Sequence, residues 1–197
     1  MTAMFLVSDT HFGHEKTCTV FKRADGSPLR PFSCAEEMDE EMVKRWNERV
    51  RPRDKVYHLG DVVINRKSLS ILERLNGDKI LIKGNHDIFK LEDYAKYFRD
   101  IRAYDVKDGM ILSHVPIHID SIERFGTNVH GHLHANRVMK RTRWGETDQF
   151  DEAIDPRYFN VSVECIDYAP ILFEDLKKRI IEQGGQVGFR QRHAVVM

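Results

Sequence analysis

The 197-residue sequence lacks several features that mark whole classes of protein. No apolar run approaches the roughly 20 residues that a membrane-spanning helix needs. Only three cysteines occur, widely spaced and without a CxxC pair, so no disulfide framework is indicated and a reducing compartment is favoured. The N-terminus lacks the basic start and long apolar stretch of a signal peptide. These absences predict a cytoplasmic protein without a membrane partner.

An excess of charge of one sign is also lacking. Lys plus Arg and Asp plus Glu each number 31, so the formal net charge is zero and a strong nonspecific hold on nucleic acid is not expected. The basic stretch 137–143 leaves a local nucleotide or RNA groove open, but a solvated hairpin is the favoured interpretation. No repeats, low-complexity tracts or domain boundary are visible, so we expect one domain over residues 1–197.

Short apolar runs alternate with helical patterns along the chain, which favours a layered α/β fold. Buried strands are expected over residues 4–7, 55–59, 79–83, 110–112 and 127–129. Helices are expected over about 35–50, 67–76, 90–99 and 172–183. Ser33 and Glu36 look like a capping box for the first helix. Residues 158–173 suggest a hairpin of late strands around Asp167, and residues 12–35 a long loop of the kind that is often functional.

Histidine is the one residue type that is unusually frequent, with ten copies in the chain. The stretch VHGHLH at 129–134 puts three of them at alternate positions, so an extended backbone would point all three to one face. A buried strand would carry Val or Ile there. The pattern therefore indicates a chemical role for this segment.

Each of the five predicted buried strands is followed by polar side chains. Ligand sites in α/β folds gather at the carboxyl ends of strands, so these clusters are expected to meet. They offer carboxylate and amide oxygens and imidazole nitrogens, a donor set that suits divalent Mn, Fe, Zn, Ni or Co. The set is too large for one ion and about right for two, a common device for attacking phosphate esters. Its members are Asp9, His11, Asp61, Asn85, His86, His114, His132 and His134.

The order of these blocks resembles that of the calcineurin-like metallophosphoesterases. Five blocks occur in the family's order: Asp9-x-His11, Gly60-Asp61, Gly84-Asn85-His86-Asp87, a lone His114, and Gly131-His132-x-His134. The resemblance spans residues 9–134 and is closest to the small bacterial or phage-type phosphoesterases. It implies the family fold, an αββα sandwich of two stacked mixed β-sheets flanked by helices.

The resemblance also implies a role for each matching residue. Asp61 would bridge two divalent metal ions, with Mn favoured and Ni, Co, Fe or Zn as alternatives. His86 would face the substrate and act in catalysis together with Asp61, and Asp87, the closing acid of its motif, would have a structural or supporting role. One ion would be held by Asp9, His11 and His134, and the other by Asn85, His114 and His132.

These roles imply a dinuclear-metal phosphodiesterase in which a metal-bridging hydroxide attacks phosphate in line. The expected substrates are nucleotides, such as 2′,3′-cyclic nucleotides, or nucleic-acid ends. His14, Arg30 and Arg66 are hypothesised to contact the substrate, although a surface loop, a turn and a helix start are the respective alternatives. His130 is expected to be structural.

Departures from the protein-phosphatase branch favour diesters. Ile64 stands where that branch has an acid, Asn65 where it has a phosphate-clamping arginine, and Asp87 where it has a glutamate. A phosphomonoesterase remains the alternative function. A noncatalytic metal-bound scaffold is disfavoured because His86 and the full ligand set are present. A nucleic-acid-binding module without chemistry is disfavoured by the neutral charge and the lack of interleaved aromatic and basic residues.

Overall fold

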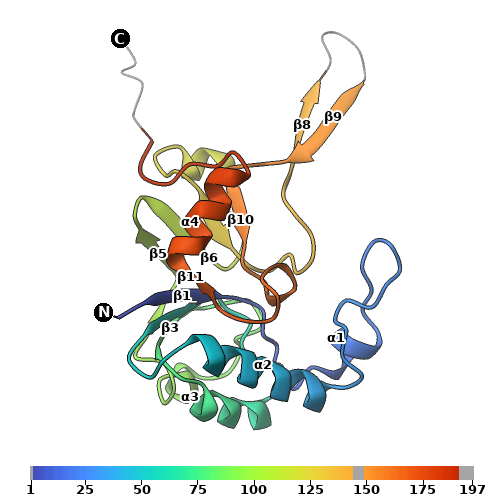
Figure 1. Cartoon of the computed structure of the whole chain (residues 1–197), viewed down its shortest axis with the longest axis vertical. Helices are drawn as coiled ribbons and strands as arrows, with labels where there is room; N and C mark the ends of the chain where they lie inside the picture. Colours follow the sequence, from blue (N-terminus) through green and yellow to red (C-terminus); the bar gives the residue numbers. More distant parts are fainter. Residues whose placement is uncertain (1, 144–148, 191–197) are drawn as a thin grey trace.

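The computed structural model describes residues 2–143 and 149–190, and two mixed β-sheets dominate it (Figure 1). The first sheet has the order β11-β1-β2-β3-β4, in which only the β11–β1 pairing is antiparallel. Its strands are β1 Met4–Val7, β2 Lys55–His58, β3 Asp78–Ile82, β4 Asp100–Arg102 and β11 Ile171–Leu172. The parallel run β1-β2-β3 brings three strand ends to one edge.

The second sheet has the order β10-β7-β6-β5, with β10, β7 and β6 parallel and β5 antiparallel to β6. Its strands are β5 Tyr104–Lys107, β6 Met110–Ser113, β7 Asn128–His130 and β10 Tyr158–Asn160. The two sheets stack, and one hydrophobic core takes side chains from both, including the fully buried Leu6, Leu81, Leu112 and Val129. This is the mixed α/β architecture that the family resemblance predicted.

Helices flank the sheets and join the strands. The α-helices are α1 Glu15–Thr19, α2 Ala35–Arg49, α3 Leu91–Tyr94 and α4 Phe173–Glu182. The 3-10 helices are η1 Arg66–Arg74, η2 Ile119–Ile122 and η3 Val163–Cys165. No helix among the described residues is both long and apolar enough to cross a membrane.

Helix α2 follows the predicted apolar stripe. Met38, Met42 and Trp46 are at most 2% exposed, so the stripe faces the core. The predicted capping box is wrong by one residue: the Ser33 backbone N–H and hydroxyl donate to Glu37, and Cys34 at the N-cap makes no side-chain cap bond. The helix start therefore relies on an acidic side chain in its first turn.

Four other predicted elements differ from the structure. The loop expected over 12–35 contains the short helix α1. The helix expected over 67–76 is the 3-10 helix η1, and the one expected over 90–99 is reduced to the single turn of α3. The hairpin expected over 158–173 is wrong, because β10 pairs with β7 in one sheet and β11 with β1 in the other. The segment between them crosses from sheet to sheet, and η3 lies on it.

A two-stranded hairpin projects from the rest of the described chain (Figure 1). Its strands are β8 Met139–Arg143 and β9 Phe150–Ile154, and all their residues are exposed. The solvated hairpin predicted for the basic stretch is thus present. Its connection, residues 144–148, lies outside the described residues.

Candidate metal centre

The predicted ligands lie on loops that follow β1, β2, β3, β6 and β7, at the carboxyl ends of these strands. Backbone bonds tie the loops together: Asp9 N donates to Gly60 O at 3.0 Å and His11 N to Asp61 O at 3.0 Å. Gly84 and Gly60 allow a close approach, because a Cβ at Gly84 would lie 2.3 Å from Asp61 Oδ1. The convergence inferred from the strand pattern is therefore built from tightly packed turns.

Five of the predicted ligands have left-handed backbones. Their φ angles are 58° for Asp9, 46° for His11, 57° for Asp61, 69° for His132 and 51° for His134. This region is uncommon for residues other than glycine, and such outliers concentrate at functional sites. The extended backbone considered for VHGHLH holds only to His130, where β7 ends, and His132 and His134 are placed by turns.

The first ligand group joins Asp9, His11 and His134, whose ligand atoms lie within 4.8 Å of one another. Asp9 Oδ1 is buried without a hydrogen-bond partner, while Oδ2 accepts from Ser162 Oγ at 2.8 Å and from His132 N at 2.9 Å. Both ring nitrogens of His11 are also buried and unpartnered. Burial, then the Arg30 charge, lowers the pKa of His11 well below its ordinary value, which favours the neutral imidazole that metals bind.

The second ligand group joins Asp61, His114 and His132 within the same 4.8 Å limit. Asn85 belongs with it, since Asn85 Oδ1 lies 2.8 Å from His114 Nε2 and 2.9 Å from His132 Nδ1. His114 Nδ1 lies 2.7 Å from Leu59 O, a carbonyl that can only accept. Burial would lower the pKa of His114, but the hydrogen bond to Asp61 outweighs it and raises that pKa. A metal ion would instead take the Nε2 lone pair of the neutral ring, which faces the oxygens of Asn85 and Asp61.

Asp61 lies between the two groups. Its Oδ2 is 3.5 Å from His11 Nε2 and 3.4 Å from His114 Nε2. Burial alone would raise the pKa of Asp61, but the interactions with His114 and the His86 N–H outweigh it and hold that pKa at about 2. Asp61 is therefore an ionised carboxylate with one oxygen facing both groups.

Asp87 holds the loops behind Asp61. Its fully buried carboxylate accepts backbone N–H bonds from Asp61 at 2.9 Å, Val62 at 3.0 Å and Gly84 at 2.8 Å. Two loops from different strands thus share one acceptor. The supporting place that the motif implied for Asp87 agrees with these contacts.

Two further histidines flank His11. The ring centroids of His86 and His14 lie 5.4 Å and 5.5 Å from that of His11. His86 is exposed and His14 is partly buried. Both are near the first ligand group without belonging to either group, and their contact with substrate stays a prediction.

The predicted substrate contact of Arg30 is wrong, because the side chain has no exposed surface to offer. Its side chain is fully buried: Nε donates to Glu164 Oε1 at 2.8 Å, Nη2 to Asp9 O at 2.6 Å and Nη1 to Thr10 O at 2.7 Å. Glu164 in turn lies 3.1 Å from Nδ1 of His134. Sequence reasoning missed Glu164, because it comes from η3 and no motif marks it.

Arg66 is exposed and pairs with Asp93, at 2.7 Å, while its guanidinium lies 5.2 Å from the centre of the Phe89 ring. These contacts already engage the Arg66 guanidinium. Substrate contact by Arg66 stays a prediction. His130 is buried and burial lowers its pKa to about 4; its ring lies 6.1 Å from that of Tyr158. His130 therefore packs in the core, as expected.

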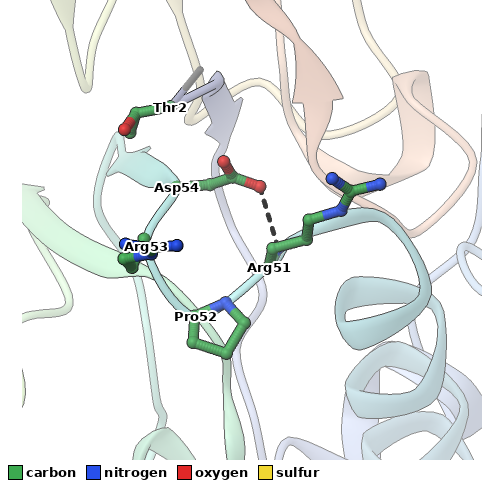
Figure 2. A pocket seen from close by; sticks show the side chains of 5 residues that line it. All are labelled: Thr2, Arg51, Pro52, Arg53 and Asp54. Atoms are coloured by element: carbon green, nitrogen blue, oxygen red, sulfur yellow. Dashed lines mark hydrogen bonds between the residues drawn. The ribbon is translucent and has the colours of Figure 1, made fainter.

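Two hollows differ in their relation to these groups. One, of about 510 Å³, is formed by Thr2 and residues 51–54 at the amino ends of β1 and β2, the edge opposite the ligands. There the Asp54 carboxylate is bonded to the Arg51 backbone, and the Arg51 side chain extends away from Arg53 (Figure 2). The other adjoins the second ligand group through Gly84, Asn85 and His114. Of the two, only the latter is lined by predicted ligands.

Comparisons with known proteins identify the family. The model of the calcineurin-like phosphoesterases matches residues 4–185. The uncharacterized protein MJ1445 of Methanocaldococcus jannaschii is 36% identical over 190 residues, which cover 93% of this chain and 94% of that protein. Among solved structures, the protein of unknown function AQ665 from Aquifex aeolicus has a TM-score of 0.62 at 23% identity, covering 91% of this chain and all of that one. A novel archaeal phosphodiesterase gives 0.42 at 17% identity, covering 81% and 82% of the two chains. The chain belongs to the calcineurin-like phosphoesterase family.

Proposed function

We propose that the protein is a dinuclear-metal phosphodiesterase acting on nucleotides. The observation that carries the proposal is the position of Asp61 Oδ2, 3.5 Å from His11 Nε2 and 3.4 Å from His114 Nε2. A carboxylate oxygen that faces two ligand groups at similar distances is suited to a shared position between two cations. Asp61 is therefore the bridging ligand.

The donor atoms fit a pair of divalent cations. One cation would be held by Asp9, His11 and His134, and the other by Asn85, His114 and His132. The unpartnered buried atoms Asp9 Oδ1 and His11 Nε2 support this assignment, because buried polar atoms without hydrogen bonds are unfavourable unless another group meets them. Oxygen and imidazole donors suit Mn, with Fe, Co, Ni and Zn as alternatives. Bound metal pairs of this kind activate water as a nucleophile and stabilise charge on phosphoryl oxygens.

His86 is the residue that acts on the leaving group or the phosphoryl group of the substrate. Its backbone N–H donates to Asp61 Oδ1 at 2.8 Å, which fixes the residue beside the shared carboxylate. The ring is exposed and adjoins His11. His86 therefore protonates the leaving-group oxygen or contacts the phosphoryl group, and His14, whose ring also adjoins that of His11, is a second candidate for substrate contact.

The pairing of two candidate cations favours a diester over a monoester. A phosphate monoester dianion needs additional positive groups, and the sequence suggested Arg30, Arg66 and Lys16. Arg30 is internal and bound to Glu164, while Arg66 pairs with Asp93. A diester carries only one negative charge and therefore needs fewer positive groups than a monoester dianion.

The test uses protein stripped of metal and then supplied with Mn, Ni, Co, Zn or Mg in turn. Each form is assayed with bis-p-nitrophenyl phosphate and p-nitrophenyl phosphate, and bound metal is counted by elemental analysis. The variants are Asp61→Ala and His86→Ala. His118→Ala is the matched control, because the His118 side chain is 74% exposed and pairs only with Asp120 among the described residues.

We expect metal-dependent cleavage of the diester that both site variants abolish and the control retains. Asp61→Ala also lowers the bound metal, whereas His86→Ala leaves it unchanged. Cleavage of the monoester alone would make the protein a phosphomonoesterase. Two bound ions without cleavage of either ester would refute catalysis and favour the scaffold alternative.

A further inference from the structure

The hollow beside the second ligand group has walls that the metal chemistry does not require. Its volume is about 520 Å³, within the range of small-molecule sites. Gly84, Asn85 and His114 form one wall, so a phosphate at the centre has one ester substituent at the entrance of the hollow. The residues of the other walls therefore indicate which chemical class of substituent fits the hollow.

The outer wall is aromatic and aliphatic. Tyr104 is 60% exposed and Val115 is 44% exposed, and Ile117 lies beside them in the lining. Tyr104 opens β5 and pairs in register with Ser113, the residue before His114. The sheet thus holds an exposed aromatic ring close to a proposed metal ligand, where it has room to stack on a flat group.

The rim also carries a positive charge. Lys83 lines the hollow directly before Gly84-Asn85, and its side chain is exposed. Within residues 2–143 and 149–190, no carboxylate lies within 4 Å of the Lys83 ammonium, unlike Arg66 or Arg74. An unpaired cation beside an aromatic wall suits a ligand that combines a flat ring with negative charge.

We infer that this hollow, the Tyr104 pocket, binds the base of a nucleotide diester whose phosphate lies at the metal centre. The inference rests on the proposed function and adds to it the part of the substrate that is recognised. Tyr104 stacks on the base, Val115 and Ile117 cover its edge, and Lys83 faces the phosphate side. A diester without a base leaves the pocket unfilled.

The test compares two diesters that share a reacting five-membered cyclic phosphate. Adenosine 2′,3′-cyclic phosphate carries a base, and glycerol 1,2-cyclic phosphate does not. The variants are Tyr104→Ala, Tyr104→Phe and, as a control on an exposed aromatic of the β8–β9 hairpin, Phe150→Ala. Adenosine binding to the metal-loaded protein is measured by calorimetry in parallel, so that the pocket is tested without turnover.

Stacking of a base on an aromatic side chain corresponds to about 5- to 150-fold in affinity. We expect Tyr104→Ala to reduce the preference for the nucleotide by a factor in this range, through KM, and to weaken adenosine binding alike. Tyr104→Phe and Phe150→Ala should retain both. Circular dichroism of Tyr104→Ala checks the fold, and Lys83→Met should weaken binding of 2′-AMP while leaving adenosine unaffected.

Equal rates for the two diesters in the wild type, unchanged by Tyr104→Ala, would overturn the Tyr104 pocket and leave the phosphodiesterase standing. Failure of every ester to react would overturn the proposed function instead. In that case the calorimetry alone decides: adenosine binding that depends on Tyr104 supports the pocket, and no adenosine binding rejects it.

Discussion

The buried ion pair between Arg30 and Glu164 predicts a large and specific loss of stability on a single substitution. Both side chains are 0% exposed, and Arg30 Nε lies 2.8 Å from Glu164 Oε1. Burial alone would raise the pKa of Glu164, but Arg30 and His134 hold it at about 2. The ionised pair therefore stabilises the fold at pH above the ordinary glutamate range and loses its contribution as the pH falls toward 2.

Arg30→Met keeps the length of the side chain and removes its charge. It leaves Glu164 buried without its main partner, and removing one member of a buried pair costs about 3–5 kcal/mol. For a chain of this size that loss corresponds to a decrease in Tm of roughly 6–20 °C. The assay is urea unfolding of metal-stripped protein at pH 7, where the midpoint should fall at an unchanged m-value.

Arg74→Met is the matched control. Arg74 pairs with Glu40 by two bonds of 2.6 Å, but the two side chains are 46% and 64% exposed. Removal of such a surface pair should cost less than about 1 kcal/mol. The double substitution Arg30→Met with Glu164→Leu should recover much of the loss. An Arg30→Met protein as stable as the control, with only KM raised, would refute this reasoning and restore Arg30 as a substrate contact.

Asp87→Ala should lower the free energy of unfolding by about 3 kcal/mol or more, because three buried N–H groups lose their acceptor; a loss below about 1 kcal/mol in urea would contradict this. Gly84→Ala should reduce metal bound per chain, because its Cβ would lie 2.5 Å from Asp61 N; full metal content in elemental analysis would contradict it. Burial lowers the pKa of His58 to about 3, so the unfolded chain binds one more proton below pH 6.5 and stability falls as the pH drops from 6.5 toward 3. His58→Gln should reduce this slope by about 1.4 kcal/mol per pH unit in unfolding titrations, and an unchanged slope would contradict it.

The sequence predicted the convergence of the ligands because the rule behind it is topological. Asp9, Asp61 and Asn85 each follow a strand of one parallel run, and parallel strands bring their carboxyl ends to one edge. The α2 stripe was equally predictable, since its period of 3.6 residues reports one buried face. In both cases local sequence carries the information.

The errors arise where partners are distant in the chain. Residues 158–173 have strand-forming composition, but nothing in that composition specifies that β10 and β11 join different sheets. Arg30 and Glu164 are 134 residues apart, and only the crossing of that segment brings them together. The left-handed turns at His132 and His134 were missed for another reason: alternating histidines imitate the period of a strand.

The strained turns that carry the ligands are fixed by buried charged side chains that are not ligands themselves. A left-handed backbone costs about 1–2 kcal/mol for a residue with a side chain, and five of the proposed ligands adopt it. Such turns persist only where the surroundings fix them. Arg30 binds the carbonyls of Asp9 and Thr10 within the first turn, and Asp87 binds the N–H groups of Asp61 and Val62 within the second. Because these contacts come from side chains that are not ligands, the chain shapes the site before any ion arrives. Loss of Arg30 should therefore weaken metal binding as well as the fold, even though Arg30 donates no atom to a metal.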